Sequence, residues 1–338
     1  MNRLAGVRNL AVFVTLGLFI VMFGTGSIAF PGFFSVQNFL NLFIDNSFLL
    51  ILAVGMTFVI ISGGIDLSVG SVLALSGMVT SSLLEKVHMS PALVVPIVLI
   101  MGTALGLFMG YLIQTFELPP FIVTLAGLYL ARGLCYIVSL FTIAVTNPFF
   151  VNTAHAQVFI LGNNFLSPGA IVAIVVVLAG FFVSRYTKFG RTVFAIGGSE
   201  QSAVLMGLPV GRTKIAIYGL SGFCSSLGGI VFTLYTLSGY GLNGSGMELD
   251  TIATVVIGGT LLTGGAGNLL GTVLGVFVYG TIQTLIVFQG TLNSWWTRIA
   301  IGFLVFVFCV LQRAFVARKS AAISGSQLKQ AARAPAAG

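Results

Sequence analysis

Apolar stretches of about twenty residues, broken by glycine, proline and charged positions, run along most of the chain. A helix needs about 20 apolar residues to cross roughly 30 Å of hydrocarbon, whereas a membrane barrel shows segments of about ten residues with alternating hydrophobicity. The pattern therefore predicts an all-α, polytopic transmembrane helical bundle of about ten spans. The predicted spans are 10 to 30, 41 to 61, 67 to 84, 91 to 114, 119 to 140, 168 to 184, 215 to 238, 250 to 264, 268 to 288 and 293 to 312.

The span predicted at 250 to 264 is short and rich in glycine, which favours a half-helix or a re-entrant segment. An even number of crossings places both termini on one side, and the positive-inside rule makes that side the cytoplasm. Most basic residues lie in three segments that this rule assigns to the cytoplasm. They are Arg3, Arg8, Arg185, Lys188, Arg191, Arg212, Lys214, Arg313, Arg318, Lys319, Lys329 and Arg333.

Composition agrees with this topology. Hydrophobic residues make up 57% of the 338 positions and charged residues only 7%, so the chain is an integral membrane protein rather than a soluble domain. The net charge of +8 follows from membrane topology and does not indicate nucleic-acid binding. We expect one transmembrane domain over 1 to 313 and a disordered cytoplasmic tail over 314 to 338, because the tail cannot bury enough apolar area to fold.

Two glycine-framed segments carry carboxylates inside apolar sequence, one around Asp66 and one that begins with Glu248 and Asp250. Asp66 and Asp250 each precede an apolar run, where an aspartate can cap a helix. A charge at membrane depth costs on the order of 3 kcal/mol and is usually retained for use, so a translocation pathway or an ion site is the other interpretation. Arg132 is the obvious intramembrane counter-charge, and the sequence leaves open whether it meets a carboxylate.

The loop 185 to 214 contains a predicted short helix over 199 to 207. Ser199 is a good N-cap, Glu200 suits the positive end of a helix, and Gly207 is a good stop. Ala203 and Met206 are three residues apart and are predicted to share a face. Because so short a helix is marginal in water, it docks either on a partner or on its own membrane domain, and spacing alone leaves both open.

The chain lacks GxxxxGK[ST] and HExxH, and neither His88 nor His155 has a partner at metal-ligand spacing. The sequence therefore predicts no ATP hydrolysis by a P-loop, no metal site and no catalytic residues in this chain. A membrane-embedded enzyme would need a nucleophile or a metal cluster that the sequence does not offer.

Four long motifs in order resemble the membrane subunits of bacterial monosaccharide ABC importers of the ribose type. They are SGGIDLSVGSVLALSG (62 to 77), LPPFIVTLAGLYLARGL (118 to 134), GRTVFAIGGSEQSAVLMGLPV (190 to 210) and ELDTIATVVIGGTLLTGGAGNLLGTVLGVFVYG (248 to 280). The resemblance implies a multi-pass permease in the bacterial inner membrane, in contact with lipid, whose 199 to 207 helix is the coupling helix. Ser199, Glu200, Ala203, Met206 and Gly207 are its candidate contact residues.

The same resemblance implies three protein partners: ABC ATPase subunits, a second homologous permease in a hetero- or homodimer, and a periplasmic sugar-binding protein. This chain would bind no cofactor, since ATP and Mg²⁺ would be used by the partner ATPase. Two runs together are similar to permeases of galactofuranose importers, which implies a hexose in its furanose form. They are GTLNSWWTRIAIGFLVFVFCVLQR (290 to 313) and NSFLLILAVGMTFVIISGGIDLSVGS (46 to 71). The alternative is an ion-coupled secondary sugar transporter that uses Asp66 and Asp250 as ion sites.

Overall fold

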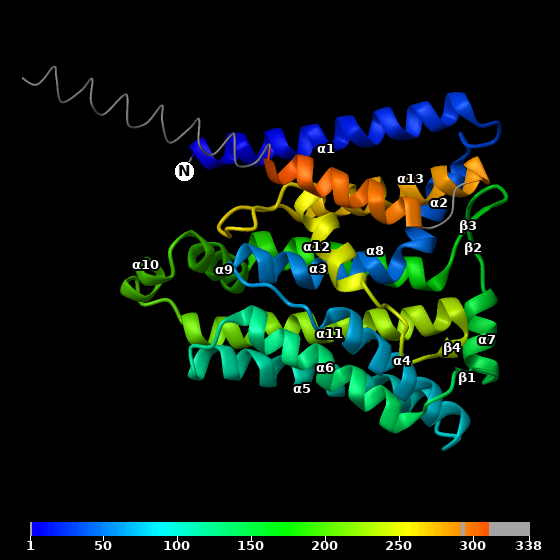
Figure 1. Ribbon diagram of the computed structural model, residues 1–338, viewed down its shortest axis with the longest axis horizontal. Helices are drawn as coiled ribbons and strands as arrows, with labels where there is room; N and C mark the ends of the chain where they lie inside the picture. Colours follow the sequence, from blue (N-terminus) through cyan, green and yellow to red (C-terminus); the bar gives the residue numbers. More distant parts are fainter. Residues whose placement is uncertain (1, 292–294, 311–338) are drawn as a thin grey trace, which may run out of the picture.

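The computed structural model describes residues 2–291 and 295–310 as a bundle whose long helices run roughly along one direction (Figure 1). Six of the described helices are long and apolar enough to cross a membrane, which confirms the polytopic helical class. These helices are α1 (Asn2–Ala29), α5 (Pro91–Thr115), α6 (Pro120–Val138), α8 (Pro168–Tyr186), α11 (Val210–Thr236) and α13 (Leu269–Gln289).

A bent pair of helices would bring the number of spans to seven. α2 (Val36–Asp45) and α3 (Ser47–Ile61) meet at an angle of 59° and together pass the test for one broken span. Two further predicted spans form helices of fewer than 18 residues, α4 (Val69–Glu85) and α12 (Met247–Ile257), and a third is described only over Trp295–Val310. The half-helix expected over 250 to 264 thus starts and ends earlier, and turns replace it from Gly258 onward.

The bundle is not purely α-helical. The segment 141 to 166, between the spans predicted at 119 to 140 and 168 to 184, contains strands and a short helix, and one of its strands pairs with the chain that follows α11. The strands pair antiparallel, β1 with β4 and β2 with β3. The elements are β1 (Ile143–Ala144), α7 (Pro148–His155), β2 (Val158–Leu161), β3 (Asn164–Leu166) and β4 (Ser238–Gly239).

The two ends of the bundle differ, and we name them by what they carry. The hairpin end carries α7 and the four strands, and the α10 end carries α9 (Lys188–Gly198) and the projecting α10 (Glu200–Leu205) (Figure 1). The predicted tail 314 to 338 and the basic residues from Arg313 onward lie outside the described residues.

The core lies around α3 and α11. Almost every residue of α3 is buried, and α11 packs on α5, α3 and α4 through small residues. A methyl group on Gly106 of α5 would collide with the Tyr218 carbonyl of α11, and one on Gly222 would collide with the Gly102 carbonyl. In lipid, helices associate by close packing rather than by hydrophobic burial, which explains the small residues at this contact.

Candidate functional site

Two helices begin inside the bundle, after stretches of non-helical chain. The segment 62 to 68 leads into α4, and the segment 240 to 246 leads into α12. Their first turns touch, because an added methyl group on Gly70 would collide with the Glu248 carboxylate and the Gly244 carbonyl. Irregular backbone of this kind is tolerated inside a membrane bundle only where protein or water surrounds it. Two glycine-framed segments that are far apart in sequence therefore form one site.

Asp66 is fully buried beside the start of α4. Its Oδ1 accepts hydrogen bonds from the backbone N–H of Ser68 at 2.9 Å and from the Ser68 hydroxyl at 2.6 Å. Its Oδ2 accepts a hydrogen bond from the Ser221 hydroxyl of α11 at 2.6 Å. The N-cap of α4 is Ser68, without a side-chain capping bond, so the capping interpretation is wrong for Asp66. Asp66 instead supports the turn that precedes α4 and links that turn to α11. Ser221 could not be identified from the sequence, because no pattern indicates that it faces Asp66.

Arg132 of α6 contacts the segment that leads into α12. Its Nη1 donates to the carbonyl oxygens of Gly241 and Asn243, each at 2.7 Å. Glu248 is close enough to attract Arg132 electrostatically, and Oε2 of Glu248 is buried without a hydrogen-bond partner among the described residues. Arg132 therefore satisfies carbonyls that the broken helix leaves unpaired and places a positive charge near a buried carboxylate.

Asp250 does not cap α12. It lies within the first turn, and the capping position belongs to Gly246, whose φ of 87° few other residues adopt. The Asp250 carboxylate instead accepts a hydrogen bond from the Tyr279 hydroxyl of α13 at 3.0 Å, and Arg298 attracts it electrostatically. Because the carboxylate bonds to a side chain of α13 and the capping position belongs to Gly246, the capping interpretation is wrong for Asp250.

The projecting helix α10 has the predicted ends. The Ser199 hydroxyl accepts the N–H of Ser202 at 3.2 Å, and Gly207 follows the helix with φ of 73°. Glu200 forms an ion pair with Lys214 at the start of α11. The cap and the stop are thus local features that the sequence was sufficient to predict.

The exposed face of α10 differs from the predicted one. Ala203 is completely buried and packs with Ile196 and Val210, so it does not share an outward face with Met206. The outward face is apolar instead: Leu205 is 88% exposed and Met206 is 65% exposed. Spacing over a helix of less than two turns could not decide which side faces its own chain, because burial of Ala203 depends on α9 and α11.

Three glycine-containing segments meet in backbone contact behind α10. The Gly265 amide donates to the Ile61 carbonyl at 2.8 Å. A methyl group on Gly197 would collide with that carbonyl and with the Gly265 amide, and one on Gly264 would press against Gly63. We call this contact of residues 61 to 64, 197 and 264 to 265 the glycine junction. It joins the end of α9 to the non-helical segments next to α3 and α12.

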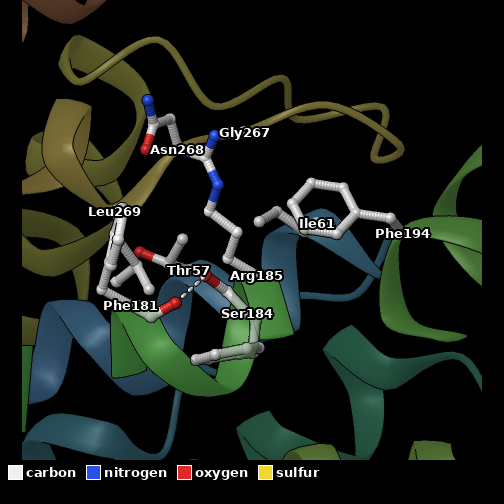
Figure 2. Close-up of a pocket in the computed structure, with 10 residues that line it drawn as sticks. Thr57, Ile61, Phe181, Ser184, Arg185, Phe194, Gly267, Asn268 and Leu269 are labelled. Atoms are coloured by element: carbon white, nitrogen blue, oxygen red, sulfur yellow. Dashed lines mark hydrogen bonds between the residues drawn. The ribbon is translucent and has the colours of Figure 1, made fainter. Parts of the chain in front are cut away.

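A small cavity of about 130 Å³ lies beside the glycine junction. Figure 2 shows Arg185 of α8 extending toward Gly267 and Asn268, with Phe194 of α9 on another side of the cavity. Asn268 is the N-cap of α13, and its side chain accepts the N–H of Leu270 at 3.1 Å. The ends of α8 and α9 and the start of α13 are therefore separated by free space here, which leaves room for them to repack.

Comparison with known proteins connects this architecture to a family. The family described as "Branched-chain amino acid transport system / permease component" matches residues 38–309. The Inner membrane ABC transporter permease protein YjfF of Escherichia coli K12 is 49% identical over 90% of this chain and 92% of its own length. The Fructose import permease protein FruG of Bifidobacterium longum is 42% identical over 89% of each chain. The Ribose import permease protein RbsC of Haemophilus influenzae is 37% identical over 78% of this chain and 81% of its own. No solved structure matches the chain significantly.

Proposed function

Because this chain belongs to the ribose-type monosaccharide ABC permease family and is a multi-pass inner-membrane protein, we propose that it forms the membrane path of a sugar importer driven by ATP hydrolysis on separate ATPase subunits. The observation that supports this proposal most strongly is the exposed apolar surface of α10. An apolar turn that is almost fully exposed at Leu205, and capped at both ends, is a surface suited to a protein partner.

The proposed orientation places the α10 end in the cytoplasm. Lys188, Arg191, Arg212 and Lys214 all lie at that end, next to α10, and the positive-inside rule favours the cytoplasm for such loops. The hairpin end would then face the periplasm and receive a sugar-binding protein. The remaining proposed partners are two ATPase subunits, which use ATP and Mg²⁺, and a second homologous permease.

The proposed coupling route runs through the glycine junction. When an ATPase subunit displaces α10, the end of α9 moves with it, and Gly197 is in backbone contact with Ile61 and Gly265. Backbone contacts transmit displacement better than contacts through flexible side chains, because they have no rotamers to absorb it. Movement at α10 would therefore reach both α3 and the turns between α12 and α13.

The proposed substrate is a hexose, with galactofuranose as the specific candidate. Its support is the similarity of residues 46 to 71 and 290 to 313 to permeases of galactofuranose importers. The named relatives include a fructose and a ribose permease, so sugar choice varies within the family. An ion-coupled carrier has less support at Asp66, because both of its carboxylate oxygens accept hydrogen bonds from Ser68 and Ser221.

The direct test of the docking surface is Leu205→Glu. A charge at this apolar position should abolish co-purification of the ATPase subunit and lower sugar-stimulated ATP hydrolysis by roughly tenfold or more, since desolvating an unpaired charge in an interface costs several kcal/mol. The control is Phe159→Glu, which places the same charge on an exposed apolar residue of β2 at the hairpin end and should leave co-purification of the ATPase subunit unchanged. Equal ATPase association for Leu205→Glu and the unmodified chain would rule out α10 as the docking site.

A further inference from the structure

A cavity of about 840 Å³ opens between α2, the start of α3, the end of α11 and the second half of α13. It is separate from the glycine junction and lies on the hairpin side of α12. Polar side chains from three helices line it, namely Asn41 and Asp45 of α2, Tyr235 of α11, and Gln283 of α13. Its size falls within the range typical of small-molecule sites.

The polar lining is unusual for a membrane bundle. Amides and carboxylates are costly in hydrocarbon, so their presence here indicates a cavity that holds water or a polar ligand. The Tyr235 hydroxyl donates to Asp45 Oδ1 at 3.3 Å, which joins α11 to α2 across the cavity wall by one long hydrogen bond. Such a contact is readily exchanged for a hydrogen bond to a ligand hydroxyl.

The chemistry of the lining suits a sugar. Gln283 offers amide donors and a carbonyl acceptor, and Asp45 offers acceptors for hydroxyl groups. Asn41 offers amide donors, since its Oδ1 already accepts a hydrogen bond from Gln37 Nε2 at 2.9 Å. Phe48 and Phe288 also line the cavity and supply aromatic faces for the C–H surface of a sugar ring. A ligand that presents hydroxyls on its edge and C–H groups on its face matches both kinds of contact.

The cavity also reaches the part of the molecule that the coupling route would move. Met247 and Tyr279 belong to its lining, and Tyr279 donates to Asp250 in the first turn of α12. The other end of α12 leads through Gly258 to the turn that contains Gly265 of the glycine junction. One short helix therefore spans the distance between this cavity and the junction.

We propose that this cavity is the sugar-binding site of the permease, with Asn41, Asp45, Tyr235 and Gln283 as its hydroxyl-binding residues. The assignment rests on the proposed function, because it takes a monosaccharide as the ligand. It adds a location and a set of contacts that neither the sequence motifs nor the family membership provides.

The test replaces two glutamines of α13 by tryptophan, one at a time. Gln283→Trp fills the cavity, whereas Gln289→Trp places the same side chain at an exposed position of the same helix that does not line it. Both variants are reconstituted with the ATPase subunits and the sugar-binding protein, and uptake of labelled sugar is measured together with ATP hydrolysis. We expect Gln283→Trp to lower uptake by roughly tenfold or more, a change of about 1.4 kcal/mol in the barrier, while ATPase association persists. Gln289→Trp should transport as the unmodified chain does.

The outcomes separate the two proposals. If the unmodified complex shows no ATP-dependent sugar uptake, the proposed function fails. If it transports and Gln283→Trp transports equally well, the cavity assignment is overturned while the function stands.

A labelling experiment covers the case in which Gln283→Trp fails to fold. Thr284→Cys introduces a thiol at a lining position that is not one of the four proposed sugar contacts, and a membrane-impermeant maleimide is allowed to react with the assembled complex with and without saturating sugar. The unmodified chain, which has Cys135, Cys224 and Cys309, measures the background. Sugar should slow labelling of the introduced thiol several-fold by occupying the cavity. Labelling at the same rate with and without sugar would overturn the assignment.

Discussion

Asp66 accepts three hydrogen bonds at a fully buried position of the bundle. A buried carboxylate is costly unless hydrogen bonds replace its lost hydration, and Asp66 accepts them from Ser68 and Ser221. Hydrogen bonds to a charged group are roughly twice as strong as neutral ones. The contact from Ser221 therefore contributes both to stability and to the link between α4 and α11.

Ser221→Ala tests that contribution. Removing the hydroxyl leaves Asp66 Oδ2 without its donor, so the free energy of unfolding should fall by about 1.5 to 3 kcal/mol. The control is Ser225→Ala on the same helix, because within the described part of the chain the Ser225 hydroxyl bonds only to the Ser221 carbonyl of its own helix. Thermal unfolding of the two purified variants in detergent measures the difference. Equal loss of stability would contradict a special role for the Asp66 contact.

The helices show what the sequence was able to predict. Long apolar stretches became helices close to the predicted bounds, as at 91 to 114, where α5 runs over Pro91–Thr115. Hydrophobicity over about twenty residues is a local property, and the membrane requires it wherever the chain crosses. The broken elements were less predictable. The start of α12 at Met247 lies in contact with Gly70 of α4, and the bend between α2 and α3 is set by the helices packed around them. Contacts between distant segments of this kind are not visible in a local sequence pattern.

The candidate site, too, could be predicted from the sequence only in part. The cap at Ser199 and the stop at Gly207 follow from local backbone chemistry and were predicted. The burial of Ala203 and the exposure of Leu205 follow from packing against α9 and α11, which spacing does not encode. The Gly197–Gly198 pair is visible in the sequence, but only the fold reveals that a methyl group would collide with Ile61 and Gly265 at Gly197 and would meet free space at Gly198.

Gly197→Ala and Gly198→Ala test the role of the junction between these elements. A methyl group on Gly197 meets the Ile61 carbonyl and the Gly265 amide, whereas one on Gly198 meets no atom within 4 Å. Gly197→Ala should push α9 away from α3, so that a displacement of α10 no longer reaches the broken helices. The number of sugar molecules transported per ATP hydrolysed should then fall several-fold. The ratio of sugar transported to ATP hydrolysed is the measurement. A normal ratio in Gly197→Ala would show that coupling takes another route.

The molecule combines the exposed helix α10 at one end, a cavity lined by polar side chains toward the other, and broken helices between them. In the proposed importer, ATP hydrolysis acts on α10, the glycine junction carries the displacement to α3 and α12, and α12 reaches the cavity. Half-helices that begin inside the bundle can change their contacts without breaking a long helix, which suits alternating access. The proposed transport cycle needs no catalytic group in this chain.

In the proposed importer, partner ATPases, and not an ion gradient, drive transport through this chain. The most direct measurement is sugar uptake by proteoliposomes that contain the chain with its second permease, the ATPase subunits and the sugar-binding protein. We predict that uptake requires ATP, stops when the ATPase subunits are left out, and does not respond to an imposed proton or sodium gradient. Uptake that persists in vesicles with a gradient and without ATPase subunits would contradict the account and favour a carrier that uses Asp66 and Asp250 as ion sites.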